Sequence, residues 1–294
     1  MNAISARYTT SSVTSRDGTS IGYRQLGHGP GVVVLHGAME SAGSHMALAE
    51  ALSDSFTVYL PDRRGRGMSG PYRDDYSVRK DVEDLNALLT KTGAHFVFGV
   101  SSGAIICLHA ALALPAIRRA AIFEPPLLVN NSTSAALLRR YDEEIAQGKV
   151  AAALVTGMKA ARLGPPILDL IPRVVLERLT RTMLVSDDRR ATAGDVTVRM
   201  LAPTLHYDFE LAIESQDGLE AFRSISAGVL LLGGGKSPAF LKAGLDALER
   251  LLPSAQRVEF PGLAHSAAGN PDEPMTGRGA NPERVAEELR RFFV

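Results

Sequence analysis

The sequence predicts an α/β protein with a mostly parallel central sheet, helices on both faces of the sheet and an inserted helical segment. Short apolar runs alternate with helix-like segments over residues 1–128, the pattern of a parallel sheet that is covered on both sides. The alternation stops over residues 129–216, where helix-like segments follow one another, and it resumes over residues 217–294. With 294 residues and 45% hydrophobic content, the chain is long enough to bury a large core.

The first strands are predicted from two kinds of pattern. Residues 8–13 and 20–26 alternate in polarity around the turn at Asp17-Gly18, as expected for an antiparallel hairpin at a sheet edge. The buried strands that follow are short apolar runs at residues 32–35, 56–60, 94–98 and 120–123. Helical spacing of apolar residues predicts the intervening helices over residues 44–52, 81–89 and 104–112.

Glycine and proline divide residues 129–216 into several predicted helices, which we interpret as a cap inserted into the core. Residues 228–233 restore the buried-strand pattern, and residues 257–260 form a last short strand. The final helix is predicted to begin with Asn281 as N-cap and Pro282 as its first residue. The long loop at residues 266–280 fits either a flexible edge of an active-site mouth or a surface insertion.

Composition narrows the class of protein. The chain has 32 basic and 32 acidic residues, a balance that gives no preference for nucleic acid or an anionic membrane. Its single cysteine, Cys107, excludes an internal disulfide and a cysteine-based metal site. The sequence shows neither a signal peptide nor a membrane span, so we expect a cytoplasmic protein. Nothing in the sequence indicates an oligomeric state.

A glycine-flanked serine lies where a predicted strand meets a predicted helix, in Phe98-Gly99-Val100-Ser101-Ser102-Gly103. A serine at such a sharp turn is held in a strained conformation that exposes its hydroxyl, and the glycines allow strand and helix to pack closely. The helix N-terminus adds backbone N–H groups where an oxyanion would form. We therefore predict that Ser101 is a nucleophile; the letters alone also fit a serine-rich turn between core elements.

A serine nucleophile needs a general base. Of the seven histidines, only His265 lies in a loop just after a late core strand, and we predict that it is the base. His109, in the middle of an apolar helix, is expected to be a hydrogen-bonded core histidine. His36 is expected to brace its own loop.

Together these features resemble the α/β-hydrolase superfamily over nearly the full length of the chain. The matching motifs are His36-Gly37 after the third strand, the glycine-rich Asp62-Arg63-Arg64-Gly65-Arg66-Gly67 after the fourth, the turn at Ser101 and the late His265. In that superfamily the triad order is serine, acid, histidine. The glycine-rich segment is expected to form a structural loop network rather than a substrate clamp.

The position of the acid departs from the common pattern of the superfamily. Most relatives have an aspartate after the strand that matches residues 229–232, and this chain has Ser237 there. A second solution in the superfamily places the acid after the strand that follows the elbow helix, and Glu124 occupies that position. This arrangement resembles the zearalenone lactone hydrolases. Asp208, where the cap returns to the core, is the alternative acid.

The resemblance also implies an oxyanion hole and a substrate pocket. The oxyanion hole would use the backbone N–H groups of Ser102 and of Gly37 or Ala38. Apolar residues near the predicted mouth and in the cap are candidates for the pocket wall, which would favour an apolar acyl or alcohol group. These candidates are Met39, Leu127, Leu128, Met183, Met200 and Leu205.

The predicted activity is hydrolysis of a carboxylic ester or lactone of a small molecule through an acyl-enzyme. His265 would take the proton from Ser101, Glu124 would fix the His265 tautomer, and no metal or organic cofactor is expected. The same triad also serves thioesterases, carbon–carbon bond hydrolases and perhydrolases, and a slow small-ligand binding protein is the alternative outside enzymes. Haloalkane dehalogenases and epoxide hydrolases are disfavoured because they use an aspartate nucleophile.

Overall fold

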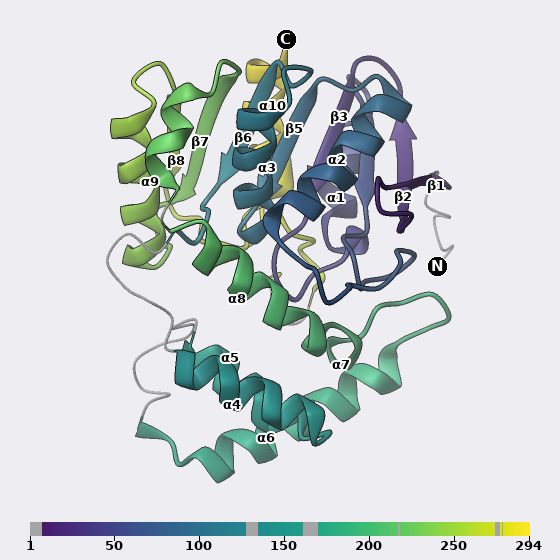
Figure 1. Cartoon of the computed structure of the whole chain (residues 1–294), viewed down its shortest axis with the longest axis vertical. Helices are drawn as coiled ribbons and strands as arrows, with labels where there is room; N and C mark the ends of the chain where they lie inside the picture. Colours follow the sequence, from purple (N-terminus) through teal and green to yellow (C-terminus); the bar gives the residue numbers. More distant parts are fainter. Residues whose placement is uncertain (1–7, 128–134, 161–169, 217, 274–276, 278) are drawn as a thin grey trace.

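A single sheet forms the centre of the protein (Figure 1). The computed structural model describes residues 8–127, 135–160, 170–216, 218–273, 277 and 279–294. Within these residues the sheet has eight strands in the order β1-β2-β4-β3-β5-β6-β7-β8. The strands are β1 (Thr9–Thr14), β2 (Ser20–Gly27), β3 (Gly31–Leu35), β4 (Thr57–Pro61), β5 (Phe96–Val100), β6 (Arg119–Phe123), β7 (Gly228–Gly234) and β8 (Gln256–Phe260).

Strand direction follows the sequence patterns. β1 and β2 form the predicted antiparallel hairpin, and β2 pairs antiparallel with β4. The pairs from β4 through β3, β5, β6 and β7 to β8 are all parallel. Because parallel strands end at the same edge of the sheet, the loops after β3, β5, β6, β7 and β8 meet there.

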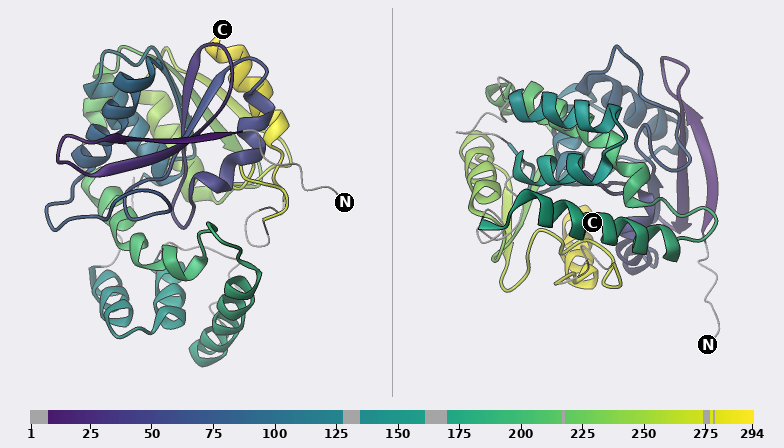
Figure 2. Two further views of the ribbon diagram at one scale, coloured as in Figure 1. Left: turned by 90° about the vertical axis from the view of Figure 1, so that its right-hand side faces the viewer. Right: turned by 90° about the horizontal axis from the view of Figure 1, so that it is seen from below.

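Helices cover both faces of the sheet (Figure 2). On one face the apolar sides of α2 (Val78–Thr92), α3 (Ser102–Ala113) and α9 (Ala239–Leu251) join one core cluster. On the other face α1 (Met46–Leu52), which follows the short helix η1 (Ala42–His45), packs with α10 (Pro282–Phe293) in a second cluster. The fold class is thus as predicted. α3 is buried on nearly all sides, which explains its largely apolar sequence, and Cys107 lies fully buried within it.

The predicted start of the last helix is confirmed. The Asn281 side chain accepts a hydrogen bond from the backbone N–H of Arg284 at 3.2 Å, and Pro282 is the first helical residue. Proline is favoured there because the first N–H groups of a helix have no partner within it.

A group of helices lies between β6 and β7 and beyond one end of the sheet (Figure 1). They are α4 (Ala135–Ala146), α5 (Val150–Ala160), α6 (Arg173–Arg190), α7 (Val198–Leu201), η3 (Ala202–Thr204) and α8 (Leu205–Glu214), followed by η4 (Leu219–Ser224). α8 lies nearest the sheet, and its residues Leu211 and Ala212 belong to the first core cluster. The predicted cap, residues 129–216, begins outside the described residues, so its boundaries stay a prediction.

Across the part of the chain that the structure describes, no helix combines the length and the apolar character needed to span a bilayer.

Candidate active site

The strand register aligns three of the predicted site residues at the carboxyl edge of the sheet. Leu35 pairs with Gly99 across β3 and β5, and Val100 pairs with Phe123 across β5 and β6. When the same pairing is extended one or two residues past the strand ends, Gly37, Ser101 and Glu124 lie side by side. The spacing is tight, because a Cβ on Gly37 would lie 2.9 Å from the Ser101 Cβ.

Ser101 occupies the sharp turn between β5 and α3. Its φ of 55° and ψ of −123° lie in a region that non-glycine residues avoid, at a cost of roughly 1–3 kcal/mol. Its backbone N–H donates to the Phe123 carbonyl at 2.9 Å, which ties the turn to the end of β6. Cβ atoms on Gly99 or Gly103 would approach backbone atoms to within 2.4 to 2.5 Å, so only glycine fits at both positions. The predicted elbow geometry is therefore present.

Glu124 and His265 form a hydrogen-bonded pair beside this turn. His265 Nδ1 lies 2.7 Å from Glu124 Oε2, and the Gly234 N–H donates to Glu124 Oε1 at 2.7 Å. The carboxylate is fully buried, whereas the His265 side chain is 30% exposed. A carboxylate accepts only, so Nδ1 carries the hydrogen and Nε2 is left to accept a proton. The rings of His265 and Phe123 have centroids 6.4 Å apart, which places the pair next to the backbone partner of Ser101.

Backbone strain gathers at this site. Within the described ranges, only three non-glycine residues have positive φ: Met39 at 58°, Ser101 at 55° and Glu124 at 45°. They follow β3, β5 and β6, the three adjacent strands in the middle of the parallel sheet. Strained residues persist where the surrounding structure holds them, and they cluster at functional sites.

The loop after β3 supplies candidate oxyanion donors. The Gly37 N–H donates to the Glu40 carboxylate at 2.7 Å, so of the two predicted alternatives the Ala38 N–H is the one left for an oxyanion. Ser102 is the first residue of α3, and first-turn N–H groups have no partner inside a helix. Glu40 is not among the predicted site residues, although a carboxylate three residues after Gly37 is a local signal.

Asp208, the alternative acid, has other partners. Arg63 Nη1 donates to Asp208 Oδ1 at 2.8 Å, and Arg66 Nη2 donates to Oδ2 at 2.5 Å. The Ser102 hydroxyl also donates to Oδ1 at 2.8 Å. Burial alone would raise the pKa of Asp208, but the charges of Arg66 and Arg63 outweigh it and hold the pKa below its ordinary value. Asp208 thus joins α8 to the core, and the structure pairs His265 with Glu124.

The other predicted framework residues have the expected contacts. His36 Nε2 accepts the Arg63 N–H at 3.1 Å, and its Nδ1 donates to the Gly37 carbonyl at 3.0 Å, so it braces its loop. Asp62 accepts N–H groups from Ala42 and Met68. His109 Nε2 lies 3.0 Å from the Ser215 hydroxyl, as predicted for a hydrogen-bonded core histidine.

The predicted pocket-wall residues that the structure describes have different surroundings. Leu127 belongs to the core cluster and lies near Gly244 of α9, and Leu205 packs near Gly157 of α5. Met200 is 57% exposed on α7, Met183 and Met39 are half-buried, and Leu128 lies outside the described residues. Apolar residues on cap helices serve first to pack those helices, so composition alone does not separate a wall from a core.

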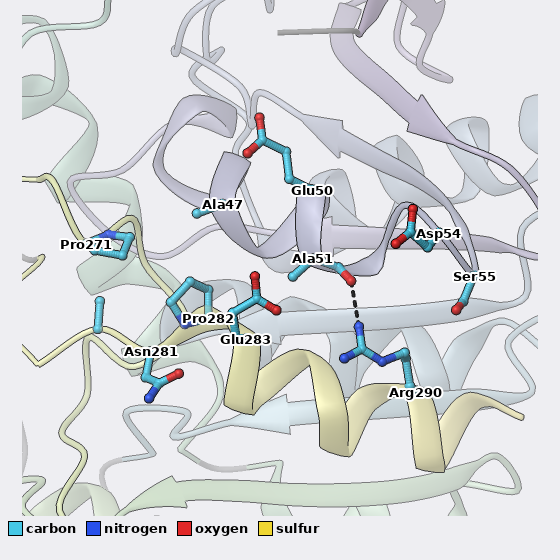
Figure 3. A pocket seen from close by; sticks show the side chains of 11 residues that line it. Ala47, Glu50, Ala51, Asp54, Ser55, Pro271, Asn281, Pro282, Glu283 and Arg290 are labelled. Atoms are coloured by element: carbon cyan, nitrogen blue, oxygen red, sulfur yellow. Dashed lines mark hydrogen bonds between the residues drawn. The ribbon is translucent and has the colours of Figure 1, made fainter. Parts of the chain in front are cut away.

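A surface groove of about 710 Å³ lies away from these residues, between α1 and α10 (Figure 3). Its lining includes the carboxylates of Glu50, Asp54 and Glu283, and Arg290, which donates to the Ala51 carbonyl at 2.5 Å. None of the predicted site residues lines this groove. In the described segments, no cluster of three His, Cys, Asp or Glu residues could hold a metal ion.

Comparison with known proteins agrees with the fold. The pimeloyl-[acyl-carrier protein] methyl ester esterase of Xanthomonas campestris pv. campestris (strain B100) is 27% identical over 280 residues, 92% of this chain and 97% of that protein. The enzyme of the same name from Stenotrophomonas maltophilia (strain R551-3) is 36% identical over 92 residues, 31% of this chain, and the match spans only 34% of that protein's length.

A solved structure and a protein family also match most of the chain. The crystal structure of an alpha/beta hydrolase from Sphaerobacter thermophilus DSM 20745 superposes with a TM-score of 0.77 at 33% identity, covering 97% of this chain and 100% of that one. The family described as the alpha/beta hydrolase fold matches residues 30–269. With its register, elbow and strand order, the chain belongs to the α/β-hydrolase fold family.

Proposed function

We propose that the protein is a serine hydrolase that cleaves a carboxylic ester or lactone of an apolar small molecule. The observation that carries this proposal is the 2.7 Å contact between His265 and the buried Glu124, at the end of the strand next to the strained Ser101. A histidine that is oriented by a carboxylate and lies beside a serine is the arrangement that activates a hydroxyl for acyl transfer.

Each group has a defined role in the proposed reaction. His265 takes the proton of the Ser101 hydroxyl at Nε2 while Glu124 stabilises the imidazolium through Nδ1. The Ser101 oxygen attacks the ester carbonyl, and the N–H groups of Ser102 and Ala38 hold the oxyanion. His265 then gives its proton to the leaving alcohol. Water, activated by the same histidine, hydrolyses the acyl-enzyme and returns Ser101.

The relatives guide the choice of substrate. The curated relatives are named as methyl ester esterases, so methyl esters of medium-length acids belong on a substrate panel. Lactones belong there because the place of Glu124 resembles the zearalenone lactone hydrolases. Thioesters, carbon–carbon substrates and peracid formation test other reactions of the same triad. Rapid turnover of any member excludes the slow ligand-binding alternative.

The test is covalent labelling with a fluorophosphonate, measured as intact mass. We expect one adduct on the wild type, none on Ser101→Ala, and labelling of Glu124→Gln that is slower by about 10³–10⁴-fold, as for loss of the orienting carboxylate in other triads.

The variant Asp208→Asn tests whether Asp208, rather than Glu124, is the acid that orients His265. If Asp208 served His265, its substitution would slow labelling to that extent and Glu124→Gln would label normally. A folded wild type that does not label would contradict the nucleophile assignment.

A further inference from the structure

A second pair of a histidine and a carboxylate, the buried His45 and the partly buried Glu40, lies beside the candidate site. Glu40 Oε2 accepts the Gly37 N–H at 2.7 Å and lies 3.1 Å from His45 Nε2. The other ring nitrogen of His45, Nδ1, lies 2.9 Å from the Ala268 carbonyl oxygen. The His45 side chain is 1% exposed. Through His45, these contacts link the loop after β3, which holds Gly37 and Ala38, to the loop that holds His265.

The partners of His45 define its protonation state. A carbonyl oxygen only accepts, so Nδ1 carries a hydrogen. Nε2 faces Glu40 Oε2 at 3.1 Å, and the pKa of Glu40 is held below its ordinary value, so this oxygen belongs to an ionised carboxylate, which only accepts. Both ring nitrogens therefore donate, and His45 is an imidazolium paired with the Glu40 carboxylate.

The pair lies close to the nucleophile. A Cβ on Gly37 would be 3.1 Å from Glu40 Oε2 and 2.9 Å from the Ser101 Cβ. A carboxylate this near a developing oxyanion would repel it, and the charge of His45 cancels that repulsion. By taking the Gly37 N–H, Glu40 also fixes the peptide that precedes the Ala38 N–H.

We propose that Glu40 and His45 are positioning residues for the oxyanion hole, and that they act only while His45 is protonated. The inference rests on the proposed function, because it concerns the oxyanion of that reaction. When His45 loses its proton, the lone pair of Nε2 faces Glu40 Oε2 and the link between the two loops breaks. Activity should then fall on the alkaline side.

The groups that face the pair set the direction of this pH dependence. Burial alone would lower the pKa of His45, but Glu40 and, more weakly, Glu273 hold it above its ordinary value. Burial alone would raise the pKa of Glu40, but His45 and, less strongly, His265 hold it below its ordinary value. His36 also faces His45, and burial lowers its pKa, so it stays neutral. The link is therefore present below the His45 pKa, which is raised above its ordinary value, and it is lost as pH rises through that pKa.

The variants separate positioning from stability. Glu40→Gln removes the charge that raises the His45 pKa, so the alkaline loss of kcat on p-nitrophenyl butyrate should move down by about one pH unit or more. The ratio of variant to wild-type kcat should recover as pH falls. His45→Gln leaves the Glu40 charge uncompensated and should lower kcat by about tenfold to hundredfold, with KM nearly unchanged. The double variant should be faster than His45→Gln alone.

Asn270→Ala is the matched control. Asn270 joins the same two segments by donating to the Gly43 carbonyl at 2.8 Å and accepting the Ala47 N–H at 2.9 Å, without contacting Gly37. This variant should lower the thermal midpoint and keep the wild-type pH profile. If the pair were merely structural, the pH profile of kcat for Glu40→Gln would run parallel to that of the wild type. The fold-loss of kcat in the double variant would then equal the product of the fold-losses in the two single variants. This result would overturn the proposal.

Two wild-type measurements keep the test decisive if a variant fails to fold. ¹⁵N NMR of the wild type should show both His45 nitrogens protonated at neutral pH, and a neutral ring would overturn the proposal. Fluorophosphonate labelling of the wild type distinguishes failure of the proposed function from failure of the inference about Glu40 and His45. Without labelling the proposed function fails and this inference fails with it, whereas labelling combined with parallel pH profiles contradicts the pair alone.

Discussion

The Glu124 carboxylate fits beside the candidate site because its neighbours on the next strand are small. The row that contains Ser101 and Glu124 continues to Gly233 on β7. A Cβ on Gly233 would lie 3.1 Å from Glu124 Oε1 and 2.8 Å from a Leu245 methyl carbon. The strand that carries the acid in most relatives thus ends in glycines here, and they leave room for the carboxylate from β6.

This arrangement predicts that Gly233→Ala impairs catalysis without changing any group of the triad. The added methyl group should displace the Glu124 carboxylate and slow fluorophosphonate labelling by about tenfold to hundredfold, since small misplacements of catalytic groups are costly. Gly228→Ala on the same strand is the control, because its nearest neighbour would lie 3.6 Å away. Equal labelling of the two variants would argue against this role for Gly233.

At the scale of residues, the sequence predicts the site residues that belong to a local motif. Ser101 lies in a strand–turn–helix motif, and His265 and Glu124 each follow a recognisable strand. The contact of His45 with the Ala268 carbonyl cannot be predicted from a local pattern, because it depends on residues 266–270 folding against residues 42–47, more than 200 positions earlier. Of the two interpretations of the long loop, neither anticipated that Ala267 and Ala268 are fully buried.

Among the described elements, α8 connects the inserted helices to the turn at Ser101. Asp208 on α8 binds Arg63, Arg66 and the hydroxyl of Ser102, the residue next to Ser101. Removing one partner of a buried ion pair leaves uncompensated charge, so Asp208→Asn should lower the free energy of unfolding by about 3–5 kcal/mol. Urea denaturation measures this loss.

The matched control is Asp188→Asn. Asp188 pairs with Arg199 at 2.9 Å on the cap surface, where an ion pair contributes about 1 kcal/mol or less. Comparable losses for the two variants would contradict the anchoring role of Asp208.

The elements of the core are predicted well because each strand is an apolar run and each helix has a buried side at helical spacing. The cap is harder, since its apolar residues serve contacts among its own helices. Tyr141 of α4, for example, donates to the Ala202 carbonyl and packs on Phe209 of α8. Nothing local in the sequence specifies such pairs.

For the whole molecule, the lowered pKa of His109 predicts a loss of stability in acid. Burial lowers the pKa of His109 from 6.5 to about 4, so the folded state resists its protonation while the unfolded state accepts it. The contribution of neutral His109 to the free energy of unfolding is complete above about pH 6.5. As pH falls to about 4, roughly 2–3 kcal/mol of it is lost. His109→Gln should flatten the dependence of unfolding free energy on pH in this window, as measured by urea denaturation. His28→Gln, at an exposed histidine, should keep the wild-type slope.

The place of Cys107 makes the molecule suited to distance measurements. It is the chain's only cysteine, it is fully buried in α3, and burial raises its pKa, which keeps the thiol protonated and unreactive. A cysteine introduced at exposed Leu179 on α6 and another on the core would therefore be the only thiols that take up a spin label or a dye. Movement of α6 relative to the sheet during turnover can then be followed in solution without first removing a native thiol.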